Sequence, residues 1–92
     1  MQINHLDIIH STDVMADDYA EKLEEIFSKE QLTEGDLKEA RWNLQWLEGL
    51  TYTLRHLRIW HGVERDYADY MAEEAKIREL VIKYTKQILN HS

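Results

Sequence analysis

Arginine and histidine side chains occur together in residues 55–62, RHLRIWHG, which is the segment of the chain best equipped for chemistry. Arg55, His56 and His61 fall within seven residues of one another. An arginine can stabilise the negative charge that develops on a reacting phosphate, and a histidine can serve as acid or base near neutral pH. The segment therefore supports one catalytic hypothesis, in which these three residues act on a phosphate ester.

The spacing of Arg55 and His61 resembles the R-x(4–6)-H pattern of the HEPN-type ribonucleases, a family of small all-α proteins that often dimerise. The resemblance implies that the arginine and histidine meet across a dimer and act on an RNA phosphate. It covers about 35 residues, because a glycine, Tyr67 and a long amphipathic pattern follow the histidine. Val63 stands where many members of the family carry a tyrosine.

The spacing of the histidines does not form a metal-binding pattern. His5 and His10 are five residues apart, and so are His56 and His61. On a helix this spacing turns two side chains about 140° away from each other, so neither pair can ligate one ion from one face. We expect no metal and no cofactor.

Acidic residues are concentrated in the N-terminal third of the chain. Residues 1–36 carry ten acids against two lysines, a charge of −8, whereas residues 37–62 carry +2 and residues 63–92 carry −1. Such a segment repels nucleic acid phosphates, and it either favours a basic partner or simply keeps the chain soluble. A further hypothesis is that it mimics DNA phosphates toward a nucleic-acid enzyme. The acids expected to bind a partner are Asp17, Asp18, Glu21, Glu24 and Glu25.

Hydrophobic periodicity predicts an all-α fold. Apolar residues recur at spacings of three and four over about 12–30, 34–61 and 64–90, and the chain lacks proline and has only three glycines. Residues 1–10 are ambiguous, because they fit a helical turn, a short strand or an unstructured arm.

Local signals mark where these helices should begin and end. Ser11 or Thr12 is expected to cap the first helix. Thr33 and Asp36 form a capping box with aspartate in place of glutamate, which predicts the start of the second helix. Gly62 lies where a left-handed residue would end that helix.

The second predicted helix has an apolar arc wider than one neighbouring helix can cover. Trp42, Trp46 and Trp60 extend the arc on one side. This helix therefore needs packing partners on two sides, either other helices or a second copy of the chain. The leucine-rich part of the arc is Leu37, Ala40, Leu44, Leu47, Leu50, Leu54 and Leu57.

The third predicted helix has a narrower apolar stripe with two charges inside it, Glu74 and Arg78. A charge at such a position is costly unless it is paired. We therefore expect Glu74 to meet a cation, for which Arg58 of the second helix is the candidate.

Together these patterns predict one domain, in which a long antiparallel hairpin of the second and third helices is crossed by a shorter N-terminal helix and completed as a homodimer. The favoured function is a non-catalytic regulator or inhibitor that binds another protein, of the kind phages and mobile elements encode. Trp42, Trp46, Trp60 and the five acids named above would form its binding surface. The chain has no cysteine and no apolar run approaching about 18 residues, so we expect a cytoplasmic protein without disulfides or membrane spans.

Overall fold

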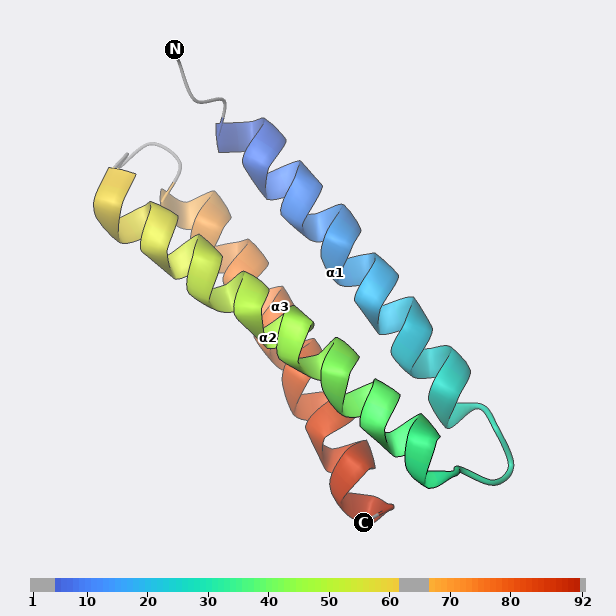
Figure 1. Ribbon diagram of the computed structural model, residues 1–92. Coiled ribbons are helices and arrows are strands. Elements are labelled where there is room, and N and C mark those ends of the chain that lie inside the picture. The colour runs from blue at the N-terminus through green and yellow to red at the C-terminus, as the bar shows by residue number, and fades with distance from the viewer. Residues whose placement is uncertain (1–4, 62–66, 92) are drawn as a thin grey trace.

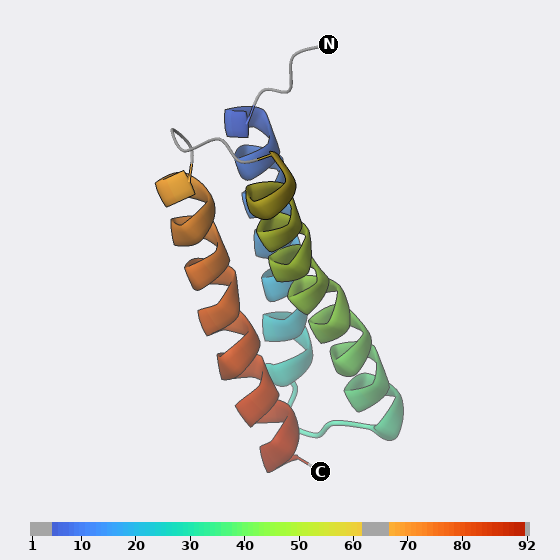
Figure 2. The same ribbon diagram turned by 90° about the vertical axis from the view of Figure 1, so that its left-hand side faces the viewer.

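The computed structural model describes residues 5–61 and 67–91, which form three α-helices: α1 (His5–Phe27), α2 (Glu34–His61) and α3 (Tyr67–Asn90). α2 runs antiparallel to both neighbours, so α1 and α3 point the same way (Figures 1 and 2). The bundle is elongated, with principal extents of 48 × 20 × 15 Å. The predicted all-α, three-helix architecture with an antiparallel α2–α3 hairpin is confirmed within these residues.

The start predicted for the first helix is wrong, because α1 begins at His5 rather than near Ser11 or Thr12. The hydroxyl of Thr12 donates to the carbonyl of Ile8 at 2.8 Å, so it serves the helix interior instead of capping its end. Ile8 packs against the core and extends the apolar stripe toward the N-terminus. α1 is the shortest of the three helices, as predicted, but with 23 residues against 24 in α3 it extends further along the hairpin than the sequence indicated.

The capping box at the start of α2 forms as predicted. Asp36 N–H donates to the Thr33 hydroxyl at 3.0 Å, and Thr33 N–H donates to the Asp36 carboxylate at 2.9 Å. Lys29, in the loop after α1, adds an ion pair of 2.7 Å to the same carboxylate. The lysine and the two Thr33 hydrogen bonds lower the pKa of Asp36 to about 2. The Gly62 turn lies outside the described residues.

The centre of the core is the midline of α2, where Ala40, Leu47 and Leu54 are fully buried. α1 covers one side of this midline and α3 covers the other, with Tyr70 and Tyr84 among the largest buried side chains. The wide apolar arc of α2 is thus covered largely within one chain, because α2 is the central helix of the three. No helix of the described chain is both long and apolar enough to span a membrane.

Candidate functional site

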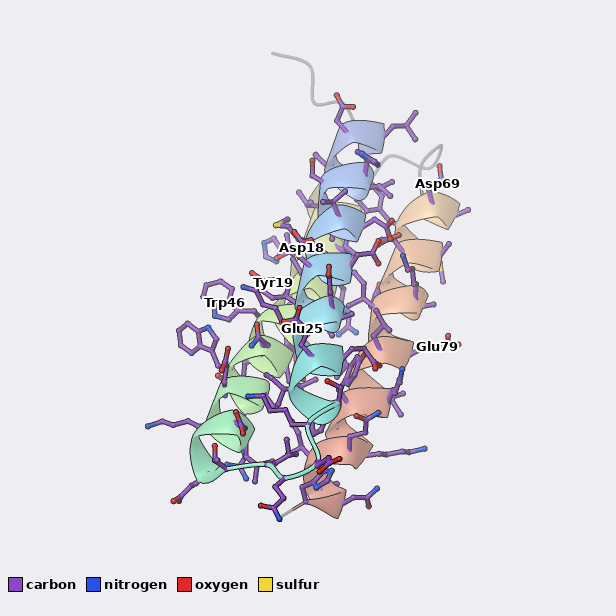
Figure 3. All side chains as sticks on the ribbon, turned by 90° about the vertical axis from the view of Figure 1, so that its right-hand side faces the viewer. Asp18, Tyr19, Glu25, Trp46, Asp69 and Glu79 are labelled. Carbon is purple, nitrogen blue, oxygen red and sulfur yellow. The ribbon has the colours of Figure 1, made fainter. Side chains whose placement is uncertain are left out.

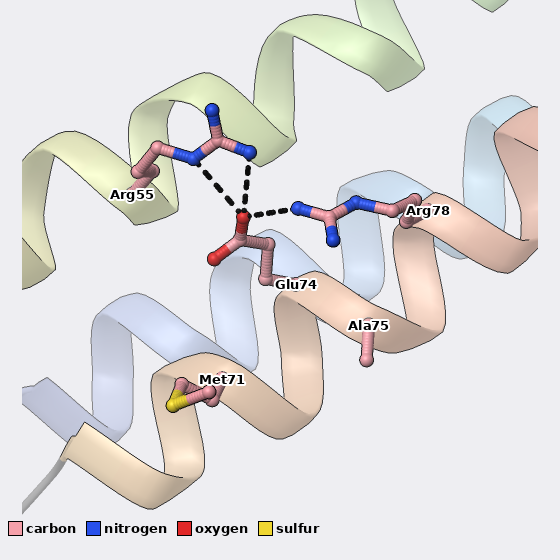
Figure 4. Close-up of a pocket in the computed structure, with 5 residues that line it drawn as sticks. All are labelled: Arg55, Met71, Glu74, Ala75 and Arg78. Carbon is pink, nitrogen blue, oxygen red and sulfur yellow. Dashed lines mark hydrogen bonds and ion pairs between the residues drawn. The ribbon is translucent and has the colours of Figure 1, made fainter.

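A buried carboxylate lies where α2 meets α3. The Glu74 side chain is only 6% exposed, and one of its oxygens, Oε1, accepts three hydrogen bonds (Figure 4). Arg55 donates through Nε and Nη2 at 3.2 and 3.1 Å, and Arg78 donates through Nη2 at 2.6 Å. A cation for Glu74 is therefore present on α2 in Arg55, whereas the predicted candidate, Arg58, lies outside the described side chains.

This arrangement gives Arg55 a structural role. It stabilises a charge that would otherwise be costly to bury, and it joins α2 to α3. The two arginines, with Met71 and Ala75, also line a depression of about 310 Å³ beside the carboxylate. Any action of Arg55 on a phosphate would compete with Glu74 for the same N–H groups.

Two residues of the catalytic hypothesis, Arg55 and His56, line different depressions. Arg55 lines the depression beside Glu74, whereas the exposed His56 lines a separate one with Tyr52 and Leu57. The predictions on Arg58, Trp60 and His61 concern side chains that lie outside the described part of the chain. Within the described ranges, no group of three or more histidine, aspartate or glutamate residues could hold a metal ion.

Two large apolar side chains of α2 face water. Trp42 is 60% exposed and Trp46 is 51% exposed. Their rings pack edge to face with centroids 5.8 Å apart, so they form one aromatic surface. Figure 3 shows Trp46 on the side of α2 that adjoins Tyr19 of α1. Met15, which is 42% exposed, lies four residues before Tyr19 and thus on the same side of α1. We call these four residues the tryptophan face.

The five acids of α1 that were predicted to bind a partner divide into two sets. Asp17 and Glu24 turn toward α3, where Lys76 approaches Asp17 at 3.4 Å and Lys83 approaches Glu24 at 2.8 Å. Hydrogen bonds from Lys83 and then Tyr84 lower the pKa of Glu24. Asp17 and Glu24 therefore help to hold α1 on α3.

The other three acids stay in solvent. Asp18, Glu21 and Glu25 are exposed and make no ion pair with any described residue. Their spacing of three and four places them along one line of α1, which we call the acidic ridge. Figure 3 shows Asp18 and Glu25 on α1, the helix nearest the viewer. Lys22, the lysine of α1, offsets part of their charge.

Sequence reasoning missed a carboxyl pair between α1 and α3. Burial and then the nearby Asp13 raise the pKa of Glu73 to about 7. One Glu73 oxygen, Oε1, is buried without a hydrogen-bond partner among the described residues. Lys76 is hydrogen bonded to Asp13 and lowers the pKa of that carboxyl, so the proton of the pair resides on Glu73. The spacing of Glu73 and Lys76 on α3 was visible in the sequence, but their position opposite Asp13 was not.

Comparisons of the chain with protein-family models, with curated proteins and with solved structures give no match. The fold and the surface define a class in structural terms: a small acidic helical bundle that exposes tryptophans on its central helix. The function must therefore be inferred from the geometry of that surface.

Proposed function

We propose that this chain is a non-catalytic protein-binding protein that recognises its partner through the tryptophan face. The observation that supports the proposal is the exposure of Trp42 and Trp46, at 60% and 51%, side by side on one helix. Tryptophan is among the residues most enriched at the energetic centres of protein interfaces. A pair of them in contact supplies a rigid apolar anchor of the kind such centres use.

The free energy available from covering this surface is large enough to contribute substantially to binding. Covering the exposed parts of the two indoles would remove roughly 250 Å² from water, a gross gain of about 6 kcal/mol. A micromolar complex corresponds to about 8 kcal/mol of net binding free energy, and association itself has a large entropic cost. The tryptophan face can therefore anchor a complex, while polar contacts around it must supply the rest.

In this proposal the chain acts as a regulator or inhibitor of its partner in the cytoplasm, as small acidic helical proteins of phages and mobile elements do. The acidic ridge on the outer side of α1 would help to attract a basic partner surface. A DNA-mimic inhibitor is the variant of this function in which the ridge replaces phosphates. It would require many carboxylates spaced along a larger surface, and the ridge supplies three.

A homodimer is also part of the proposal, and the outer side of α3 offers the surface for it. Met71, Ile82 and Leu89 are 44%, 48% and 66% exposed. Their spacings of eleven and seven residues place them within about 20° of one another around the helix, so they form one apolar stripe. Sedimentation of Ile82→Glu beside the wild-type chain tests this, and an unchanged sedimentation coefficient would exclude the stripe as a dimer interface.

The binding function is tested by affinity capture with crosslinking, followed by mass spectrometry. The double variant Trp42→Ala/Trp46→Ala should lose the proteins that the wild-type chain captures. Tyr52→Ala is the matched control, because Tyr52 is 58% exposed and lies on the same helix outside the tryptophan face. Identical captured proteins from the wild type and the tryptophan double variant would overturn the proposal.

A further inference from the structure

We propose that Arg55 and Arg78 form a second binding site, which takes a carboxylate side chain from an acidic peptide segment. The site is the depression of about 310 Å³ where α2 meets α3 (Figure 4). Two arginines and one glutamate line it, so its lining carries a net charge of +1 in a chain whose formal net charge is −7. The site lies on the α3 edge of α2, and it does not depend on the tryptophan face.

The two guanidinium groups are held in place and still have N–H groups to donate. Arg55 binds Glu74 through Nε and Nη2, and Arg78 binds it through Nη2. Nη1 of each arginine makes no hydrogen bond with a described residue, and the two side chains are 44% and 52% exposed. Because Glu74 already fixes both side chains, binding a second carboxylate would cost them little further rotamer freedom.

Apolar surface adjoins the arginines at both ends of the site. At one end is Met71, which lines the depression and is 44% exposed. At the other end a smaller depression of about 150 Å³ shares both arginines and extends to Tyr52. The Tyr52 ring is 58% exposed, and its centroid lies 6.0 Å from the Arg55 guanidinium carbon. A peptide with apolar residues on each side of its acidic residue would cover both ends.

Glu48 determines which end of this groove receives the carboxylate. It lines the smaller depression and accepts a hydrogen bond of 3.3 Å from the Tyr52 hydroxyl. A further carboxylate beside it would be repelled. The acidic side chain is therefore expected in the larger depression, where Glu74 is only 6% exposed and the two arginines reach solvent.

The same features disfavour two other occupants. Nucleic acid presents phosphates in close succession, and Glu48 would oppose the phosphate next to the one on the arginines. A second copy related by a two-fold axis through the depression would bring two pairs of arginines against each other. An acidic peptide matches the site, because it presents one carboxylate between apolar side chains.

The test uses a short fluorescein-labelled peptide with a central glutamate between leucines, and fluorescence anisotropy reports its binding. The glutamate peptide should bind the wild-type chain at least about fivefold more tightly than the same peptide with glutamine in that position. Ala75→Glu should weaken binding of the glutamate peptide at least about tenfold, because it places a competing carboxylate in the depression, three residues from Arg78.

The matched control is Ala72→Glu, which makes the same chemical change at an exposed position of α3 outside the depression. Alanine and glutamate are both strong helix formers, so neither variant should unfold α3. Ala72→Glu should bind the glutamate peptide within about twofold of the wild-type chain. Equal weakening by the two variants would overturn the proposal, because it would show that net charge decides binding rather than the site.

Removing a cation gives the reciprocal test. Arg78→Gln should abolish the preference for the glutamate peptide over the glutamine peptide. Arg41→Gln, which removes an exposed arginine outside both depressions, should keep that preference. Persistence of the preference in Arg78→Gln would also overturn the proposal.

The inference and the proposed function can fail separately. Trp42→Ala/Trp46→Ala should bind the glutamate peptide as the wild-type chain does, and loss of binding would place the peptide on the tryptophan face and overturn the inference alone. Tighter binding of inorganic phosphate than of the peptide would assign the depression to a phosphate ligand. Met71 also belongs to the apolar stripe of α3, so binding that weakens as the protein concentration rises would identify a second copy as the occupant. Either of these results would overturn the acidic peptide.

Discussion

The two edges of α2 differ in which kind of side chain they bury and which they leave exposed. On the edge that meets α3, a carboxylate is buried at 6% exposure and two arginines bind it. On the edge beside α1, two tryptophans keep half or more of their surface in water. The usual rule places apolar groups inside and charges outside. α2 follows that rule along its midline and departs from it on both edges.

The difference indicates what each edge is for. The buried Glu74 is fully engaged by its own chain, so its effect is on the stability and register of the α2–α3 hairpin. Trp42 and Trp46 have solvent-exposed apolar surface, which a partner can cover. Substitutions on the first edge should therefore change the stability of the fold, and substitutions on the second edge should change the affinity for the partner.

A substitution on the midline between the two edges should give the largest loss of stability. Leu47→Ala should lower the free energy of unfolding by about 2–5 kcal/mol, because it opens a cavity at a fully buried position on the midline of α2. Urea denaturation followed by circular dichroism measures this. A loss below about 1 kcal/mol would show that the core relaxes around the cavity and that the bundle is loosely packed.

The α3 edge should give the next largest effect. Arg55→Ala should lower the free energy of unfolding by about 1–3 kcal/mol, because it removes two hydrogen bonds to a buried carboxylate. The loss in Arg55→Ala/Arg78→Ala should not equal the sum of the single losses, because both side chains bind the same oxygen. Unchanged stability of the single variant would mean that Arg55 is free for another role, including the phosphate chemistry that its spacing to His61 suggests.

The carboxyl pair between α1 and α3 should give a pH-dependent effect. The pKa of Glu73 is raised from 4.5 to about 7 in the folded chain, so the folded state binds the proton more tightly than the unfolded state does. The stabilisation is complete below pH 4.5 and is lost as the pH rises through about 7. The wild-type chain should therefore be more stable at about pH 6 than at about pH 8, by about 1 kcal/mol.

Glu73→Gln isolates this contribution, because the amide cannot ionise. The melting temperature of the variant should vary less between the two pH values than that of the wild type. Lys29→Met is a useful comparison, since it perturbs Asp36, whose pKa of about 2 lies far below this range. A wild-type melting temperature that is flat or falls on acidification over the same range would contradict the assignment of the proton to Glu73.

The smallest stability effect is expected on the tryptophan edge. Trp42→Ala should lower the free energy of unfolding by less than about 1 kcal/mol, because 60% of the residue is already exposed. The same variant should weaken partner capture. Denaturation and capture on one protein sample give both readings, and a stability loss as large as that of Leu47→Ala would assign the tryptophans to the core.

The fold was predictable where local chemistry determines it. The capping box of Thr33 and Asp36 satisfies helix-end groups within four residues, so sequence alone identifies it. The prediction of where α1 begins was wrong for a related reason. Thr12 is a good capping residue, but inside a helix its hydroxyl can bond the carbonyl four residues earlier, and only the packing of Ile8 decides between the two.

The candidate site was less predictable, because its features depend on which helix faces which. The width of the α2 arc correctly required cover on two sides, but it could not distinguish α1 and α3 from a second copy. The acids of α1 looked alike in sequence, although two of them meet lysines about sixty residues away. The exposure of Trp42 and Trp46 could be deduced only after α1 and α3 had been placed on either side of the α2 midline.

Lys76 and Lys83 are seven residues apart, and together they hold the acids of α1 from one side of α3. Both lysines are about half exposed, so ions in the medium can reach these contacts. Concentrated salt weakens such pairs, whereas the buried Glu74 and the leucine core of the hairpin are largely insulated from it. The tryptophan face needs α1 as well as α2, so raising the ionic strength of the surrounding solution would weaken one of the contacts that hold this surface together, while the buried Ala16 and Leu23 of α1 continue to hold it.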